Sequence, residues 1–166
     1  MTAAGPAGPP SPDPPVAVRP FAHADLPALL KLEAEAFGED AYDDDDFEEF
    51  RVMDAAFFVA EVAGAFAGYS IGWLPPRGGE LVSLAVDPAH RRRGLARLLT
   101  HAVLDDLRRQ GARSCRLQVR VSNLPAIDFY TRLGFKVVGL WREYYRDYES
   151  AYVMRMRLGR GRRGTA

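Results

Sequence analysis

The feature that most constrains this 166-residue chain is the stretch 81–100, where an apolar strand pattern passes through a basic turn into a helix. The turn carries three consecutive arginines followed by Gly94. The first turn of a helix has amide N–H groups without intrahelical partners and a partial positive charge, and both stabilise an anion. Arginine adds formal charge, and glycine lets a ligand approach the main chain closely. This stretch predicts an α/β fold with a loop that binds pyrophosphate.

Two common phosphate-binding motifs do not fit this turn. A Walker A loop ends in Gly-Lys-Ser/Thr, and a dinucleotide fingerprint has the pattern G-x-G-x-x-G. Here Gly94 is followed by Leu95-Ala96-Arg97, which matches neither. On the turn alone, a basic surface loop before an ordinary core helix stays an alternative.

Composition limits the class of protein. The length and the hydrophobic content of 48% suit one globular domain, which buries about two-thirds of the surface that its unfolded chain exposes. The formal net charge is +0, which argues against a DNA-binding or membrane-surface protein. Charge is segregated into an acidic block at 33–49 and an arginine-rich end at 155–163. With no apolar stretch of bilayer length and no signal-peptide pattern, we expect a cytoplasmic protein.

The two ends differ from the rest of the chain. Residues 1–15 are rich in Pro, Ala and Gly and predict a disordered leader, and residues 159–166 alternate Gly and Arg and predict a flexible tail. The domain is therefore expected at 16–158. A single cysteine, Cys115, excludes an internal disulfide, and the three histidines lack ligand spacing, so no metal site is expected. We interpret Cys115 as a small buried apolar residue.

Periodicity between the ends predicts a mixed sheet with flanking helices. Strands are expected at 16–19, 57–62, 65–73, 80–86, 116–121, 135–141 and 151–158. Helices are expected at 24–37, near Asp43, from Gly94 to Gly111 and around Ala126. The buried stripe of the third helix is predicted from residues at helical spacing: Leu95, Leu98, Leu99, Ala102, Val103 and Leu107.

Two motifs resemble those of the GNAT superfamily of acyl-CoA-dependent N-acetyltransferases. Arg91-Arg92-Arg93-Gly94-Leu95-Ala96 resembles the family loop R/Q-x-x-G-x-G/A. The stretch from Asn123 to Phe135 resembles the family segment N-x-x-A-x-x-[LF]-Y-x-x-L-G-F. The resemblance covers about 16–158 and implies a single-domain GNAT fold. Its mixed, mostly antiparallel sheet would have a V-shaped splay between two central parallel strands.

This resemblance implies acetyl-CoA as co-substrate and no metal. The backbone of Leu84, Ala85 and Val86 would pair with the pantetheine arm, with Asn123 on its other side. An N–H near Val86 would polarise the thioester carbonyl. Tyr130 matches the family tyrosine that acts as general acid beside the cofactor, unless it is an ordinary packing residue. The pyrophosphate would be held by the loop residues Arg91, Arg92, Arg93, Gly94, Leu95 and Ala96.

The general base is less evident. The segment 117–123, Leu-Gln-Val-Arg-Val-Ser-Asn, resembles the L-E-V-R-x-S-N segment of RimI-like ribosomal-protein and archaeal N-terminal acetyltransferases. Gln118 stands where the family has a glutamate, and an amide cannot usefully accept a proton. It could orient water or substrate instead. Three candidates for the base stay open, namely Glu80, His90 and Glu39, and we favour Glu80.

The end of the chain indicates the acceptor. Tyr144 and Tyr145, followed by Asp147 and 151–154, resemble the Y-Y…D-A-x-x-M ending of the same relatives, in which tyrosines and the loop around Phe37 hold a peptide. Our hypothesis is acetylation of a protein or peptide N-terminus, a ribosomal protein among the candidates, by direct attack in a ternary complex. The enzyme would act as a monomer or homodimer, without DNA or membrane partners.

Two alternatives stay open. The acidic residues at 39–46 could attract a polyamine or an antibiotic amine, which would make the chain a small-amine acetyltransferase. Gln118 in place of an acid could instead indicate a catalytically weak acyl-CoA-binding module.

Overall fold

The computed structural model describes residues 12–159, so most of the expected leader and tail lies outside the described residues. The strands are β1 (Val16–Pro20), β2 (Ala56–Val62), β3 (Ala65–Trp73), β4 (Gly79–Val86), β5 (Ser114–Arg120), β6 (Lys136–Trp141) and β7 (Ala151–Arg157). The α-helices are α1 (Leu26–Phe37), α2 (Asp44–Val52), α3 (Leu95–Arg109) and α4 (Leu124–Leu133). The elements expected from periodicity are confirmed, with shifts of one or two residues at most ends.

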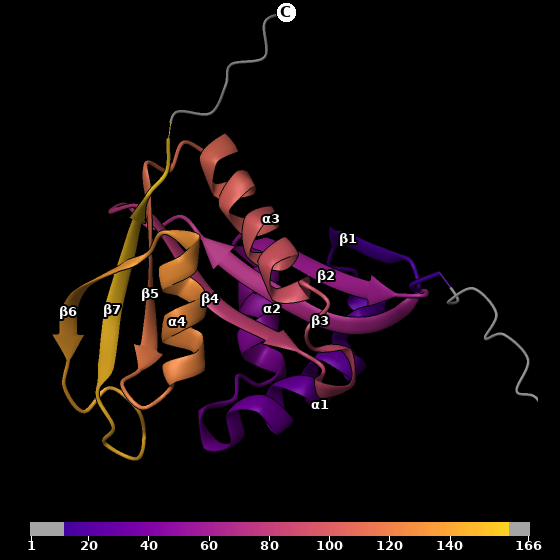
Figure 1. The fold of residues 1–166 in the computed structure, drawn as a ribbon, viewed down its shortest axis with the longest axis horizontal. Coiled ribbons are helices and arrows are strands. Elements are labelled where there is room, and N and C mark those ends of the chain that lie inside the picture. The colour runs from indigo at the N-terminus through magenta and orange to yellow at the C-terminus, as the bar shows by residue number, and fades with distance from the viewer. Residues whose placement is uncertain (1–11, 160–166) are drawn as a thin grey trace, which may run out of the picture.

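Seven strands form one sheet in the order β1-β2-β3-β4-β5-β7-β6. Every neighbouring pair is antiparallel except β4 and β5, which are parallel. This parallel pair is short, because only Gly79 pairs with Cys115 and only Glu80 with Arg116. Beyond these residues the two strands diverge, as Figure 1 shows. The predicted V-shaped splay is therefore confirmed.

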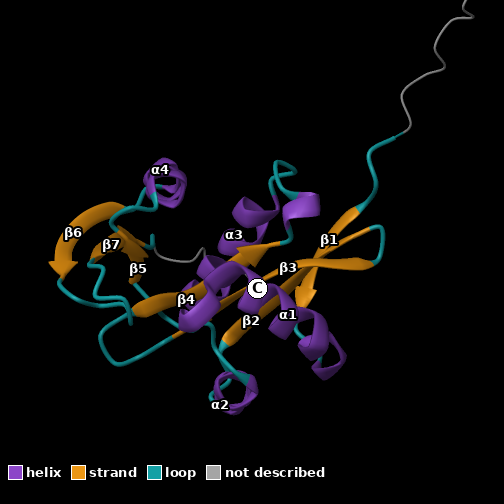
Figure 2. Ribbon diagram, turned by 90° about the horizontal axis from the view of Figure 1, so that it is seen from below, coloured by secondary structure: helices purple, strands orange, loops and turns teal. Residues whose placement is uncertain are grey.

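Helices cover both faces of the sheet. In Figure 2, α3 and α4 lie on one side and α1 and α2 on the other. On the α3 side, Leu99 and Val103 are fully buried. On the other side, Leu29 of α1 and Phe47 of α2 pack against the sheet in a second core cluster. These apolar faces fix the helices and leave the far β5-β7-β6 part of the α1–α2 face open (Figure 2).

The predicted stripe of α3 is wrong at one position. Leu98 is 47% exposed, whereas Leu104, which the pattern did not include, is 1% exposed. The sheet lies under a face centred on Leu99, Val103 and Leu107, and Leu98 lies at its margin. No helix of residues 12–159 is both long enough and apolar enough to span a membrane.

A bulge in β4 decides which way its first residues point. Ile71 of β3 pairs with Ser83, but the next residue, Gly72, pairs with Leu81. Val82 is therefore an extra residue in β4, and the strand's alternation is shifted there. A Cβ on Gly72 would lie 2.3 Å from a methyl group of α3, so glycine is required for the close approach of the helix.

Candidate active site

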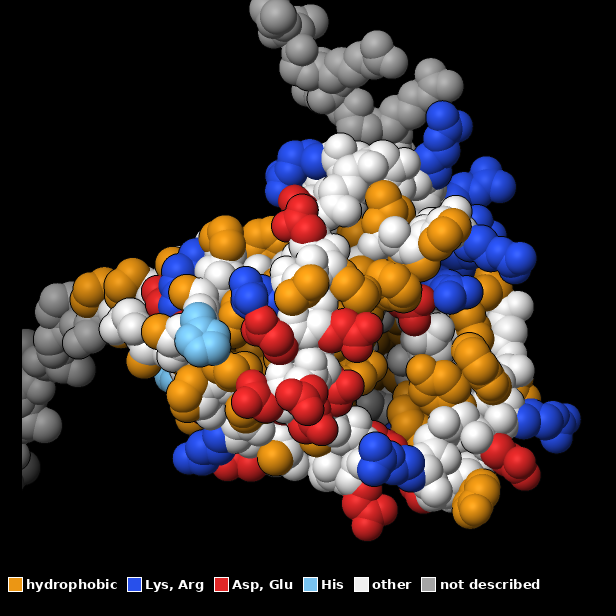
Figure 3. All heavy atoms as spheres, turned by 180° about the vertical axis from the view of Figure 1, so that it is seen from behind, with side chains coloured by type: hydrophobic (Ala, Val, Ile, Leu, Met, Phe, Trp, Pro, Cys, Tyr) orange, Lys and Arg blue, Asp and Glu red, His pale blue; other side chains and the backbone are white. Residues whose placement is uncertain are grey.

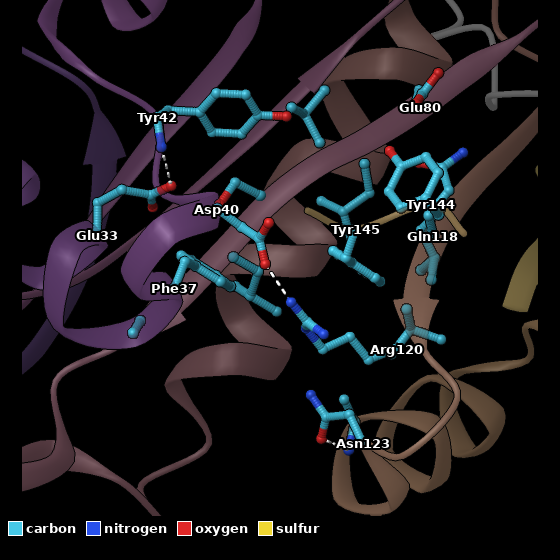
Figure 4. Close-up of a pocket in the computed structure, with 18 of the residues that line it drawn as sticks. Glu33, Phe37, Asp40, Tyr42, Glu80, Gln118, Arg120, Asn123, Tyr144 and Tyr145 are labelled. Atoms are coloured by element: carbon cyan, nitrogen blue, oxygen red, sulfur yellow. Dashed lines mark hydrogen bonds and ion pairs between the residues drawn. The ribbon is translucent and has the colours of Figure 1, made fainter. Parts of the chain in front are cut away.

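A cavity of about 630 Å³ opens where β4 and β5 diverge (Figure 4). Five parts of the chain line it: α1 with the turn that follows it, β4, β5, α4, and the connection between β6 and β7. The cavity thus lies at the splay and is lined by residues from both faces of the sheet. Its volume suits the reacting ends of two substrates.

The bulge directs Glu80 into this cavity. Ser83 faces the α1–α2 side, where its hydroxyl forms a 2.9 Å hydrogen bond with the Tyr69 hydroxyl. Leu81 packs under α3 on the opposite side. Glu80 follows on the α1–α2 side and lines the cavity with Tyr144. Its side chain is 16% exposed and accepts hydrogen bonds from Arg116 Nε at 3.2 Å and Nη2 at 3.1 Å.

The edge of β4 that faces β5 is free beyond Glu80. β5 pairs with β4 no further than that residue, and 81–84 line the cavity. Unpaired backbone groups along a strand edge can bind an extended ligand as an added strand. Of the three residues expected to pair with pantetheine, Leu84 lines the cavity, and Ala85 and Val86 continue the same strand toward the basic loop.

The basic loop has the geometry of an anion site. Residues 91–94 are exposed, and Arg92 and Gly94 have positive φ angles of 64° and 74°. The first helical bond runs from the Leu98 amide to the Gly94 carbonyl, so the amides of 95–97 have no intrahelical partner. No heavy atom lies within 4 Å of the position of a Cβ on Gly94. The loop therefore fits the pyrophosphate of acetyl-CoA.

Tyr130 and Asn123 line the cavity from α4. Asn123 caps the helix, since its side-chain oxygen accepts from the Ala126 amide at 3.3 Å. The Tyr130 ring packs edge-on against Phe135, and within residues 12–159 its hydroxyl has no hydrogen-bond partner. Burial raises the pKa of Tyr130, so the phenol keeps its proton at neutral pH. It can serve as a donor to a group bound in the cavity.

Cys115 lies beneath Tyr130 in the core. It is fully buried, and burial raises the pKa of its thiol to about 12. The thiol is therefore protonated and unreactive at neutral pH, which confirms the interpretation of Cys115 as a small buried residue. Among residues 12–159, no group of three or more His, Cys, Asp or Glu could hold a metal ion.

The structure adds a carboxyl group that sequence reasoning missed. Glu33 belongs to the acidic block, yet it is only 1% exposed and lines the cavity. Its Oε1 accepts from the Tyr42 amide at 3.0 Å, and its Oε2 has no partner in the described part of the chain (Figure 4). Burial raises its pKa to about 7. No local signal marks Glu33, because its burial depends on how the loop after α1 folds back.

Arg120 joins the two loops on the acceptor side. Its guanidinium binds Asp40, in the turn after α1, and also Asp147 at 2.8 Å and Glu149 at 2.6 Å, in the β6–β7 connection. It also lies 4.0 Å from the centre of the Tyr145 ring (Figure 4). Sequence reasoning gave Arg120 no role beyond its place in the segment 117–123. In the structure it holds together the two loops that form the outer wall of the cavity.

Of the predicted acceptor residues, four line the cavity, namely Phe37, Gln118, Tyr144 and Tyr145. The two tyrosine rings meet edge-on, with centroids 4.9 Å apart. Glu39 is not among the lining residues, although its neighbour Asp40 is. His90 lies in the short turn Pro88–His90 after β4 and does not line the cavity either. Glu80 is the candidate base that the fold brings beside Tyr144.

Comparison with known proteins identifies the class. The chain is 42% identical over 120 residues to an N-alpha-acetyltransferase of Sulfurisphaera tokodaii, which covers 64% of this chain and 72% of that protein. It is 34% identical over 152 residues to the N-alpha-acetyltransferase RimI of Mycobacterium tuberculosis, covering 87% and 94%. The crystal structure of the Escherichia coli ribosomal-protein-S18-alanine N-acetyltransferase superposes with a TM-score of 0.78 at 27% identity, covering 91% and 99%.

A splayed sheet with a free strand edge and an anion loop is the architecture of an N-acetyltransferase. The profile of the acetyltransferase (GNAT) family matches residues 25–135, well over half of the chain. The protein therefore belongs to the GNAT family of N-acetyltransferases.

Proposed function

We propose that this enzyme transfers the acetyl group of acetyl-CoA to the α-amino group of a protein N-terminus in a ternary complex. The observation that carries the proposal is the cavity at the splay of the sheet, lined from both faces. It has a free strand edge and an anion loop for the cofactor, and a wall formed by Phe37, Tyr144 and Tyr145 for the acceptor. The names of the relatives support an N-terminal α-amine over a small amine.

Acetyl-CoA, when bound, supplies the thioester whose acetyl group is transferred to the amine. In our proposal the β4 edge holds the pantetheine arm, Asn123 contacts it from α4, and residues 91–96 hold the pyrophosphate. Val86 stands six residues beyond Glu80, about 20 Å along the strand, so we assign polarisation of the acyl oxygen to an amide of the β4 edge at 81–84, which lines the cavity. These contacts use main-chain groups and arginines, so they fix the position of the acyl group without depending on a particular apolar side chain.

Two side chains carry the protons. The Glu80 carboxylate accepts a proton from the acceptor's ammonium group, which makes the amine nucleophilic. As the C–S bond breaks, the Tyr130 hydroxyl donates a proton to the leaving thiolate, and its raised pKa keeps that proton available at neutral pH. The second proton that the attacking nitrogen loses on becoming an amide returns to the Tyr130 phenolate. Gln118, two residues beyond Arg116 on the same face of β5, orients the amine or a water through its amide. His90 and Glu39, which lie outside the cavity lining, have no part in this scheme.

The acceptor class follows from the relatives and the wall. The E. coli relative is named for the alanine of ribosomal protein S18, and we include a ribosomal-protein N-terminus among the acceptors of this enzyme. Such an acceptor would place the reaction in the cytoplasm. Hydroxyl groups on Tyr144 and Tyr145 can hold the backbone of the first peptide residues while their rings exclude water.

The test is release of free thiol from acetyl-CoA with peptides that begin with Ala, Ser, Met or Glu, and with spermidine as the small amine. We expect peptide-dependent release with one preferred first residue. The Glu80→Gln variant should lose most of this activity near neutral pH and recover part of it at higher pH, where more of the acceptor is already neutral. Release with spermidine alone would contradict the proposal, and so would acetyl-CoA binding without turnover of any peptide.

A further inference from the structure

A row of charged side chains crosses four strands beside the cavity. Glu80 pairs with Arg116, Arg116 pairs with Arg155 on β7, and Arg155 pairs with Lys136 on β6. Residues that are directly opposite each other on neighbouring strands point to the same face. The row therefore places three cations and one acid in a line on the α1–α2 face, and the cations lie on the β5-β7-β6 part of it that no helix of residues 12–159 covers (Figure 2).

The cations of this row, Arg116, Lys136 and Arg155, outnumber their partners. Glu80 neutralises Arg116, whereas the one side-chain hydrogen bond of Arg155 in the described residues goes to the Ser114 hydroxyl, at 3.3 Å. Within residues 12–159, Lys136 has no ion pair. Like charges that face each other across neighbouring strands destabilise a sheet. Because Lys136 and Arg155 are exposed and have no acidic partner in the described part of the chain, the row can bind negative charge supplied by another molecule.

The row begins at the acceptor side of the cavity. Its first pair, Glu80 and Arg116, lies close enough to Tyr144 for both charges to act on that phenol. The anion loop precedes α3, so the cofactor approaches from the α3–α4 face. An acceptor therefore enters from the opposite, open face, where Figure 3 shows Lys and Arg side chains gathered on one side. The residues that follow its N-terminus have to cross this face.

We propose that the row formed by Arg116, Lys136 and Arg155 binds acidic side chains of the acceptor a few residues beyond its N-terminus. This inference rests on the proposed function. Adjacent strands lie about 4.8 Å apart, so the row spans about 10 Å, the length of about three extended residues. A second groove, whose lining includes Arg77, Arg113 and Ser114, adjoins the row at Ser114, which accepts from Arg155. The enzyme thus selects acceptors by downstream charge as well as by the first residue.

A short acidic segment fits this surface better than a long polyanion. The chain has a formal net charge of +0, and acidic side chains of α2 occupy another part of the same face (Figure 3). A nucleic acid that extended beyond the row would meet those carboxylates and be repelled. Three extended residues need only the row itself.

The experiment compares three acceptor peptides with the same first three residues and with Glu-Asp-Glu, Gln-Asn-Gln or Lys-Arg-Lys at positions four to six. At low ionic strength we expect kcat/KM to be highest for the acidic peptide and lowest for the basic one. The acidic peptide should exceed the neutral one by roughly tenfold, through KM, and about 0.3 M salt should remove most of the difference. Equal kcat/KM for the three peptides would overturn the inference and leave the proposed function intact.

Charge reversal tests the assignment to these side chains. The double variant Lys136→Glu/Arg155→Glu should reverse the ranking, and Lys136→Gln/Arg155→Gln should abolish it. The matched control is Arg132→Glu on the exposed side of α4, where Arg132 pairs with Asp128, and this variant should keep the wild-type ranking. An acidic preference that survives charge reversal would overturn the inference. Thermal unfolding of each variant confirms that it is folded.

Two other molecules could bind to the row in place of an acidic acceptor segment, and each would give a distinct experimental result. Binding of polyuridylate that is lost on charge reversal, without any ranking of the peptides, would identify a nucleic-acid surface and overturn the inference. Concentration-dependent self-association that is lost in the same variant, again without a ranking, would identify the acidic α2 of a second copy as the occupant. If no peptide is acetylated at all, the proposed function fails and this inference fails with it.

Discussion

The hydroxyl of Tyr130 can be tested separately from its ring. The ring packs against Phe135, whereas the hydroxyl has no hydrogen-bond partner in the described residues. Tyr130→Phe therefore preserves the packing and leaves no buried group unpaired. We expect kcat to fall by about 10²-fold with unchanged binding of CoA, because only the proton donor is lost. Steady-state kinetics and calorimetric titration with CoA measure the two effects, and a parallel loss of CoA affinity would indicate a packing role instead.

Glu33 makes stability depend on pH. Burial raises its pKa from 4.5 to about 7, so the folded state binds a proton more tightly than the unfolded state. Its contribution to stability is complete below pH 4.5 and is lost as the pH rises toward 7. Between pH 5 and pH 8 this loss amounts to about 2–3 kcal/mol.

The variant Glu33→Gln isolates that effect, because the amide oxygen can still accept from the Tyr42 amide. The free energy of unfolding in urea should fall from pH 5 to pH 8 by about 2–3 kcal/mol less in the variant than in the wild type. Glu48→Gln, at an exposed position of α2, serves as the control and should follow the wild-type curve. Parallel curves for the wild type and Glu33→Gln would show that Glu33 does not titrate in this range.

At the scale of elements, the loop between β4 and α3 depends on Gly94. Its φ of 74° costs about 1–2 kcal/mol for a residue with a Cβ, and a large side chain there would fill the space where the phosphate is expected. Gly94→Trp should lower CoA affinity at least about 100-fold. Gly111→Trp is the matched control, since Gly111 also has a positive φ, 100°, and open space at the other end of α3. It should lose similar stability and keep CoA affinity, as titration with CoA would show.

The elements that sequence could predict are those specified by local chemistry. Asp43 caps α2 in a reciprocal pair with Asp46, and Asn123 caps α4, so both helix starts were visible as residue types. The bulge at Val82 had no such signal, because it exists only in the register with β3. Strict alternation from Ala85 would place Glu80 on the α3 side, away from Tyr144.

The residues of the candidate site also fall into those with a local sequence signal and those without one. The anion loop and Tyr130 could be predicted because each belongs to a contiguous motif. Glu33 and the loop-bridging role of Arg120 could not, since their partners are distant along the chain and meet only when the loop after α1 folds against the β6–β7 connection. Sequence reasoning selected Glu39 from the acidic block for its position near the first helix, whereas the cavity is lined by Glu33 and Asp40.

At the scale of the whole molecule, Arg120 couples parts of the chain that are far apart in sequence. It connects the turn after α1 to the β6–β7 connection, and the Arg146 amide donates to the same Asp40 carboxylate at 3.4 Å. Both segments belong to the acceptor wall, and neither contributes to the anion loop. The acceptor and cofactor halves of the site are therefore held by different contacts and can be perturbed separately.

Arg120→Gln should loosen the acceptor half alone. The change leaves the carboxylates of Asp40, Asp147 and Glu149 without their common cation, so the two loops repel each other and the Tyr145 ring loses its cationic neighbour. Because a misplaced wall weakens positioning of the amine, we expect KM for the peptide to rise by roughly tenfold, with unchanged CoA affinity. Arg51→Gln, which removes an exposed ion pair on α2, should leave both constants unchanged. A loss of CoA affinity in Arg120→Gln would show instead that the two halves of the site are coupled through the sheet.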